Sequence, residues 1–197
     1  MKKDRRVLRT KQFIRDALIE LIEEKGFDPI TVTDLSEKAN INRGTFYLHY
    51  EDKFDLLRKL EEEILFEFKY IVSEVDHEEM FDDIFSDKPL KFLVDLFTFI
   101  SNNRRLFKAI LGHTGDPQFY HSLKSFMAQS MYSQNNRLNN LLKHHHISID
   151  YFTAYLSSAH LGVIQQWLEN DLDQPPEELA LLLTKMFKFG PLGVLKK

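Results

Sequence analysis

Residues 42–57 have the sequence NRGTFYLHYEDKFDLL, in which two aromatic residues stand four positions apart among short and charged ones. On a helix, Phe46 and Tyr50 share one face, so we expect them to pack on the preceding residues and close a small core. The positions on the other faces then point outward, and they are Arg43, Thr45, Tyr47 and His49. Gly44 lies beside them and has no side chain to hold a surface away. A short helix with hydrogen-bond donors near its start is typical of a helix that enters the major groove of DNA.

The N-terminal part of the chain contains three predicted helices. They span about 8–25, 32–39 and 43–49. Gly26 ends the first helix, because glycine readily adopts the left-handed conformation that terminates helices. Thr31 and Asp34 have the spacing of a capping box for the second helix, and Asn42 is the expected N-cap of the third. The second and third helices form a helix-turn-helix, which the first helix supports.

This arrangement resembles the DNA-binding domain of TetR-type (TetR/AcrR) transcriptional regulators. The signature of that family has KGF at the end of the first helix, T-V-x-D-L-x-x-x-A in the second, and then x-G-T-F-Y-x-H-F-x-x-K-x-x-L. The matching segments are KGF at 25–27, TVTDLSEKA at 31–39 and RGTFYLHYEDK at 43–53. The chain differs at Leu48, where some members have Tyr, and at Tyr50, where many have Phe.

The resemblance implies DNA contacts for nine residues. In the family, the hydroxyl at the start of the second helix contacts a phosphate, and the first residues of the third helix approach bases and backbone. The Tyr, His and Lys of the signature contact phosphates. The corresponding residues are Thr31, Thr33, Asn42, Arg43, Gly44, Thr45, Tyr47, His49 and Lys53. Arg43 is the candidate for base recognition, because its guanidinium group can donate to O6 and N7 of guanine together. Two alternatives stay open: Tyr47 as a half-buried cap on the core, and Lys53 as a solvated charge.

The net charge of −4 hides an uneven distribution. Residues 1–15 hold seven Lys or Arg and one Asp, so the rest of the chain is strongly acidic. A basic N-terminal arm on an acidic body suggests contact with a polyanion at one end only. The arm consists of Lys2, Lys3, Arg5, Arg6 and Arg9. These residues are candidates for phosphate or minor-groove contacts, and a solvated tail is the alternative.

The remaining residues predict a second, larger helical domain. Its helices are expected over about 52–75, 88–101, 103–112, 117–143, 148–170 and 176–189. Residues 102–119 resemble the C-terminal domain of a Firmicutes-type branch of the same regulators. The predicted fold class is therefore all-α. It combines a helix-turn-helix DNA-binding domain over 1–51 with a helical effector-binding and dimerisation domain over 52–197.

Dimerisation has a physical basis in DNA recognition. One short helix contacts too few bases for useful specificity, so such proteins usually bind as twofold pairs on successive major grooves. Residues 151–168 carry no charge, and Ser158 and Gly162 would allow another helix to approach closely. We expect the helices near 148–170 and 176–189 to form an intersubunit four-helix bundle. The alternative is that both helices complete the core of the monomer.

The resemblance also implies a small-molecule effector in the larger domain. Phe97, Phe126 and Trp167 are candidates for the wall of an apolar pocket, and each is alternatively a core residue. The three consecutive histidines at 144–146 are not expected to bind a metal, because successive helical positions point about 100° apart. We expect them to end a helix, where His suits the negative end of the dipole.

An enzyme is not expected. The sequence contains no Cys, nucleophile elbow, phosphate loop or pair of zinc histidines, so we expect no catalytic residue, cofactor or metal. We also find no targeting or membrane-spanning segment and expect a cytoplasmic protein. The sequence predicts a DNA-binding transcriptional regulator, and more specifically a ligand-responsive repressor that binds a pseudo-palindromic operator as a homodimer. The alternatives are a transcriptional activator of the same fold and a helical protein-interaction module that does not bind DNA.

Overall fold

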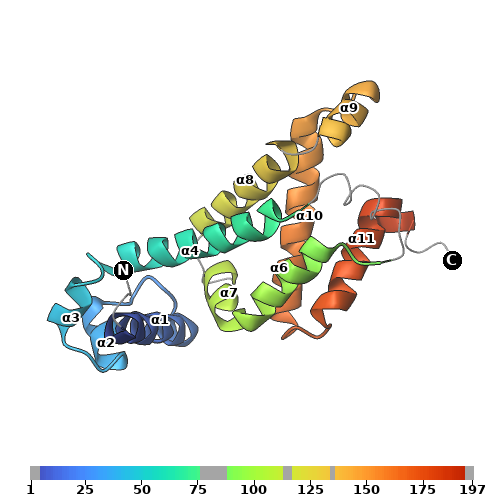
Figure 1. The fold of residues 1–197 in the computed structure, drawn as a ribbon. Helices are drawn as coiled ribbons and strands as arrows, with labels where there is room; N and C mark the ends of the chain where they lie inside the picture. The colour runs from blue at the N-terminus through green and yellow to red at the C-terminus, as the bar shows by residue number, and fades with distance from the viewer. Residues whose placement is uncertain (1–4, 76–87, 113–116, 134–135, 194–197) are drawn as a thin grey trace. The chain divides into compact units, whose positions relative to one another are not determined.

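The computed structural model describes residues 5–75, 88–112, 117–133 and 136–193, and the regular secondary structure within these ranges is helical (Figure 1). The predicted all-α fold is confirmed. The helices are α1 (Arg5–Lys25), α2 (Val32–Lys38), α3 (Arg43–Tyr47), α4 (Lys53–Ser73), α6 (Lys91–Asn102), α7 (Arg104–Leu111), α8 (Pro117–Ser133), α9 (Asn136–His144), α10 (Ile149–Glu169) and α11 (Pro176–Gly193).

Most helices lie where the sequence predicts them, and three differences matter. α1 begins at Arg5, before the expected start near residue 8, so its first turn is built from the basic arm. The helix expected over 117–143 is described as α8 and α9, and residues 134–135 lie outside the described ranges. α11 extends to Gly193, past the expected end at 189, although Gly190, with a φ of 72°, interrupts its regular helical conformation there.

The chain divides into two compact units. The first contains Met1–Phe66 and Arg105–Pro117, and the second contains Glu67–Arg104 and Gln118–Lys197. α4 is therefore shared between them, and most of α7 belongs to the first unit although it is distant in sequence. The expected domains, 1–51 and 52–197, divide the chain by function and not by compactness, and they stay a prediction.

The first unit is built around a core that α1, α2, α3 and α4 all supply. The fully buried side chains of this core include Ile14, Leu18, Leu35, Phe46 and Leu56. Gly26 ends α1 as predicted, with a φ of 74° and its amide donating to the carbonyl of Ile22 at 2.9 Å. The apolar stripe of α1 is thus covered by the helix-turn-helix, which it holds in place.

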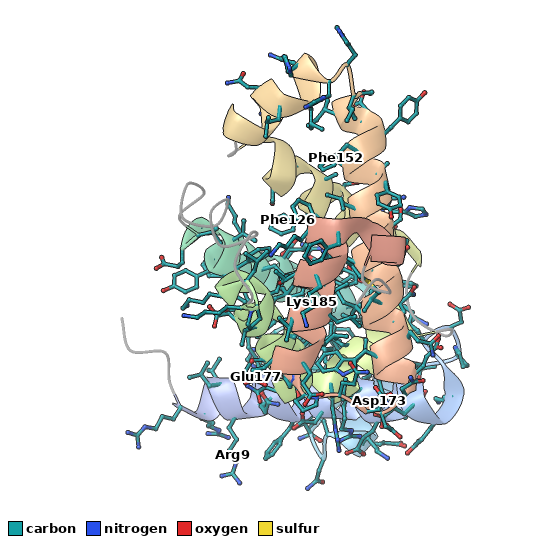
Figure 2. The ribbon with its side chains drawn as sticks, turned by 90° about the vertical axis from the view of Figure 1, so that its right-hand side faces the viewer. Arg9, Phe126, Phe152, Asp173, Glu177 and Lys185 are labelled. Carbon is teal, nitrogen blue, oxygen red and sulfur yellow. The ribbon has the colours of Figure 1, made fainter. Side chains whose placement is uncertain are left out.

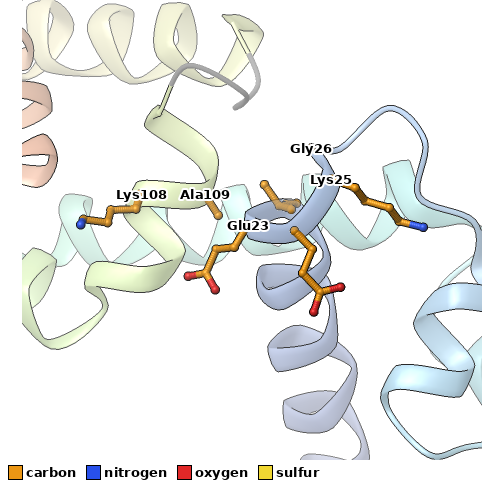
Figure 3. Close-up of a pocket in the computed structure, with 7 residues that line it drawn as sticks. Glu23, Lys25, Gly26, Lys108 and Ala109 are labelled. Carbon is orange, nitrogen blue, oxygen red and sulfur yellow. The ribbon is translucent and has the colours of Figure 1, made fainter.

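α7 carries buried apolar side chains and is joined to α1 by an ion pair. Leu106, Phe107 and Ile110 are buried. The guanidinium group of Arg105 donates to both carboxylate oxygens of Glu23, at 3.2 and 2.7 Å. A pocket of about 300 Å³ lies beside this pair, between the end of α1 and α7 (Figure 3). Its lining residues are Ile22, Glu23, Glu24, Lys25, Gly26, Lys108 and Ala109.

The second unit is a helical bundle with its own core. Side chains with at most 1% of their surface exposed include Phe97, Ile100, Phe119, Leu123 and Leu161. The amide of Leu90 donates to the hydroxyl of Thr184 at 3.0 Å, which joins the start of α6 to α11. Both groups are buried, so this bond satisfies them where water is excluded.

Candidate nucleic-acid interface

α3 is the second helix of the helix-turn-helix, and its inward side is aromatic. Phe46 is fully buried and Tyr50, just beyond the helix, keeps 5% of its surface exposed. Their ring centroids lie 5.6 Å apart. The turn that precedes α3 passes through Asn40 with a φ of 52°, and the amide of Ile41 donates to the carbonyl of Ser36 at 2.9 Å. The predicted core role of both aromatic residues is confirmed.

The residues expected to contact DNA lie on the remaining surface of α3 and its ends. Asn42, Arg43, Gly44 and Tyr47 are exposed, and Thr45 and His49 are half-buried. Arg43 donates from Nη2 to the hydroxyl of Tyr47 at 3.4 Å, so the two form one strip along the helix. The Tyr47 ring lies edge-on to Phe46 with centroids 5.7 Å apart, yet half of its surface is exposed. The Tyr47 side chain therefore packs on the core through its contact with Phe46, while the rest of its surface faces solvent.

Asn42 is the N-cap residue of α3, as predicted, but its side chain does not take part in the cap. Within the described chain its side chain makes no capping hydrogen bond. The amide of Thr45, which such a cap would bind, donates instead to the Asn42 backbone carbonyl at 2.8 Å. The side-chain amide of Asn42 is thus left exposed at the start of the recognition helix, where base contacts are predicted.

Thr31 closes the capping box of α2, as the sequence predicts. Its hydroxyl donates to a carboxylate oxygen of Asp34 at 2.7 Å and accepts from the Asp34 amide at 3.2 Å. The hydrogen bond from the Thr31 hydroxyl to the carboxylate, followed by those from the Thr31 amide and Lys25, lowers the pKa of Asp34 to about 2. The Thr31 hydroxyl would have to leave Asp34 to donate to a phosphate, whereas the neighbouring Thr33 is exposed.

Lys53 opens α4 and is bonded to the turn between α1 and α2. Its ammonium group donates to the backbone carbonyls of Phe27 and Asp28 at 3.2 and 2.6 Å. It also lies 4.8 Å from the ring centroid of Phe27 and 5.0 Å from that of Phe54. Lys53 is therefore not a plain solvated charge, because it fastens α4 to the turn before the helix-turn-helix. Its predicted phosphate contact stays a prediction.

His49 follows α3 and lies at the edge of the core. Its partial burial, and secondarily the positive charge of Lys11, lower its pKa below the ordinary value of 6.5. The ring is therefore mainly neutral near pH 7. In that form His49 can donate one hydrogen bond to a phosphate but supplies no charge.

Two residues that bond to the segment after α3 were not predicted from the sequence to have a role at this site. Asp55 and Lys59 of α4 bond to the segment that follows the recognition helix, at Glu51 and His49. Their i,i+4 spacing could have suggested an ion pair along α4. The bonds to the backbone of another segment are tertiary and have no local pattern.

The basic arm is partly helical. Arg5, Arg6 and Arg9 lie on α1 and are exposed, and Figure 2 shows Arg9 projecting away from the helix. The guanidinium group of Arg9 lies 5.3 Å from the ring centroid of Phe13. Lys2 and Lys3 lie outside the described residues. The predicted arm is therefore in part an extension of α1.

The candidate effector residues lie in the second unit. Phe97 and Trp167 are buried against each other with ring centroids 5.5 Å apart, and the Trp167 indole donates to the carbonyl of Gln174 at 2.9 Å. Phe126 on α8 is half-buried (Figure 2). Phe97 and Trp167 thus serve the core, and a role for any of the three in effector binding stays a prediction.

α9 ends at His144, as predicted for the histidine triplet. Among the described residues no group of three or more His, Cys, Asp or Glu is arranged to hold a metal ion. In the same part of the chain, no helix has the length and apolar character needed to cross a membrane.

Two family models match most of the chain. Residues 14–60 match the model described as bacterial regulatory proteins, tetR family. Residues 87–189, more than half of the chain, match the model of a transcriptional regulator C-terminal region. The first match covers the helix-turn-helix, and the second covers most of the second unit together with α7.

Individual relatives are also regulators. The HTH-type transcriptional regulator YxbF of Bacillus subtilis is 23% identical over 175 residues, which are 85% of this chain and 42% of that protein. IcaR, the negative regulator of the biofilm operon icaADBC in Staphylococcus epidermidis, is 41% identical over 49 residues, 25% of this chain and 26% of IcaR. This chain thus spans less than half the length of these curated relatives. A TetR transcriptional regulator from Streptococcus agalactiae 2603V has a similar solved structure, with a TM-score of 0.62, 26% identity, and coverage of 92% of this chain and 96% of that one.

Proposed function

The chain belongs to the TetR family of bacterial transcriptional regulators, and from this we propose that it is a ligand-responsive repressor that binds a pseudo-palindromic operator as a homodimer. The observation that carries the proposal is that α3 and its ends separate buried aromatic residues from exposed polar ones. Phe46 in α3 and Tyr50 just beyond it are buried, while Asn42, Arg43 and Gly44 are exposed at the start of the helix. A helical interaction module without DNA contacts would not need donors gathered there.

Similarity to IcaR in the DNA-binding part favours repression rather than activation. IcaR, named as a negative regulator, is 41% identical over 49 residues. A repressor needs only to occupy its operator, which a helix-turn-helix dimer can do without further contacts. An activator of the same fold would need an additional surface for the transcription machinery, so it is the second candidate.

The homodimer is supported by the exposed face of α10. Tyr151 and Tyr155 keep 81% and 57% of their surface exposed, and Gly162 has no atom within 4 Å of the position that a Cβ would take. Charged residues are absent from the sequence between 151 and 168. A long, uncharged and partly aromatic helix face is suited to packing against its own copy.

Induction would act through α4, the helix that both units share. An effector that binds the second unit better in one conformation shifts the population toward that conformation. If the change moves α4, it alters the separation of the two recognition helices of a dimer. Binding of two half-sites requires a fixed separation of about 34–36 Å, so a small change is enough to release the operator.

The proposal is tested by selecting genomic DNA fragments that the full chain binds, and then measuring affinity for the best fragment as salt is varied. We expect a site with two related half-sites and an affinity that falls steeply with salt. An Arg43→Ala/Tyr47→Ala variant should bind at least about tenfold more weakly. The control, Arg104→Ala/Tyr70→Ala, removes the same residue types from exposed positions of the second unit. Equal binding by wild type and the first variant, or binding insensitive to salt, would refute DNA recognition by α3.

A further inference from the structure

The segment that joins α3 to α4 is held by a buried acid. Among the described residues Asp55 is the only charged side chain that is buried, with 8% of its surface exposed. Its carboxylate accepts from the ammonium group of Lys59 at 2.7 Å and from the backbone amide of Glu51 at 3.1 Å, and it also bonds Arg58. A buried carboxylate is costly unless it is paired and hydrogen-bonded, and Lys59 with the Glu51 amide meets both requirements.

Lys59 continues the network to the end of the recognition segment. Its ammonium group donates to the backbone carbonyl of His49 at 3.2 Å and lies 5.3 Å from the ring centroid of Tyr50. Attraction to the electron-rich face of the ring adds to the hydrogen bond. One side chain of α4 therefore contacts His49 and Tyr50, in the segment after α3, while Asp55 accepts from the amide of the next residue, Glu51.

These contacts constitute a clamp, defined here as Asp55 and Lys59 with the carbonyl of His49 and the amide of Glu51. The Lys59 hydrogen bond is the largest influence that lowers the pKa of Asp55, and it outweighs the effect of burial. The carboxylate is thus charged at neutral pH, and the clamp is an ionic one. Its two backbone bonds lie on either side of Tyr50, whose ring is buried in the core.

The clamp has a consequence for recognition because α3 is very short. It spans only Arg43–Tyr47, and a single turn cannot hold its own direction by backbone hydrogen bonds. Its direction must come from Phe46 in the core and from how its C-terminal end is fixed. We propose that Asp55 and Lys59 are positioning residues for DNA recognition. They fix the orientation of α3 relative to α4 without contacting DNA. This rests on the proposed function as a DNA-binding regulator.

A direct phosphate contact by Lys59 is the competing explanation. The Lys59 side chain keeps 38% of its surface exposed and lies near residues predicted to contact DNA. The two explanations differ in their salt dependence. Loss of one phosphate contact lowers the slope of log affinity against log salt by about 0.9, whereas loss of a positioning residue weakens binding at every salt concentration alike.

The experiment compares full-length wild type with Lys59→Met, Lys59→Arg, Asp55→Asn and the control Arg58→Met. Arg58 also bonds Asp55, and Arg58→Met removes one positive charge as Lys59→Met does. Among the described contacts, however, Arg58 makes no bond to the segment after α3. We expect Lys59→Met and Asp55→Asn to bind the selected operator about tenfold more weakly with an unchanged salt slope. Lys59→Arg should largely restore affinity, and Arg58→Met should stay near wild type. A reduced salt slope in Lys59→Met, or wild-type affinity with only a lower melting temperature, would overturn the proposal.

A second measurement needs no DNA. Amide hydrogen exchange of the free protein should be faster for α3 and for residues 49–51 in Lys59→Met than in wild type, while α2 exchanges as before. Unchanged exchange in residues 43–51 would refute the clamp. If wild type instead bound no genomic fragment, the proposed function would fail, and so would the assignment of Asp55 and Lys59 to recognition, even with a clamp detected by exchange.

Discussion

Two glycines of the first unit, Gly44 and Gly112, differ in the space available for a side chain. Around Gly44, in α3, no atom lies within 4 Å of the position that a Cβ would take. At Gly112, just after α7, a Cβ would lie 2.4 Å from the carbonyl oxygen of Lys108. The packing of the protein itself therefore requires glycine at 112 and not at 44. The small size of Gly44 matters only to a molecule that approaches from outside.

Substitution of these glycines should separate folding from recognition. Gly44→Ala should leave the melting temperature unchanged or raise it, because Ala is the better helix former by up to about 1 kcal/mol. Operator affinity should nevertheless fall about tenfold or more, because the added methyl group keeps the helix from the DNA backbone. Gly112→Ala should show the reverse pattern, with a lower melting temperature from the clash. Thermal melts and binding isotherms check both variants, and unchanged operator affinity in Gly44→Ala would mean that DNA does not approach this position closely.

Some single-residue roles could be predicted from the sequence and others could not. The periodicity of residues 42–57 was sufficient to separate the buried Phe46 from the exposed Arg43, since burial follows from helical geometry. It could not show that the Lys53 ammonium group bonds the carbonyl of Asp28, 25 positions earlier. A family signature indicates which residues face a ligand, whereas the internal partners of those residues depend on the tertiary fold.

At the scale of elements, α2 depends on its first turn. The helix has seven residues, too few to be stable by propensity alone. The capping box of Thr31 and Asp34 satisfies amides that otherwise have no partner at the helix start. Lys25 of α1 adds an ion pair to Asp34 at 3.0 Å, so the same carboxylate also connects two helices.

The stability of the protein should therefore contain an acid-dependent part that arises from Asp34. The pKa of Asp34 is about 2 in the folded protein, below its ordinary value of 3.8. The stabilisation by its ionised form is then fully present above about pH 4 and is lost as the pH falls toward 2. Asp34→Asn should be less stable than wild type at pH 7, and the difference should shrink as the pH falls through this window. Urea unfolding at several pH values measures it, with Glu37→Gln as an exposed control on the same helix. A difference that stays constant down to pH 2.5 would contradict this assignment.

α7 shows where prediction of elements reaches its limit. Its helical character and position were predicted within about two residues, because Leu106, Phe107 and Ile110 follow the helical period. Its membership of the first unit was not predicted. The Arg105–Glu23 pair, which joins residues 82 positions apart, connects α7 to α1. Such a pair has no local signature in the sequence, so only the folded chain reveals it.

At the scale of the whole molecule, the proposed function requires two copies of the chain, each of which recognises half of the operator. The first unit contains the recognition helix, and the second presents the uncharged face of α10. Specificity for a full operator arises only when both half-sites are bound together. The strength of dimerisation and the affinity for DNA should therefore change together, even though the residues concerned belong to different units.

Enlarging Gly162 should test this coupling. In the single chain a Cβ at Gly162 meets no atom within 4 Å, so Gly162→Leu should fold normally and gain helix propensity. In a dimer that packs through α10, the added side chain would hold the partner helix away and favour the monomer. Light scattering after gel filtration should show a dimer for wild type and a monomer for the variant, and binding to the full operator should weaken to the level of a single half-site. Ser125→Leu, an enlargement at an exposed position of α8, is the control and should remain dimeric. A Gly162→Leu protein that stays dimeric and binds the operator as wild type does would show that α10 does not form the interface.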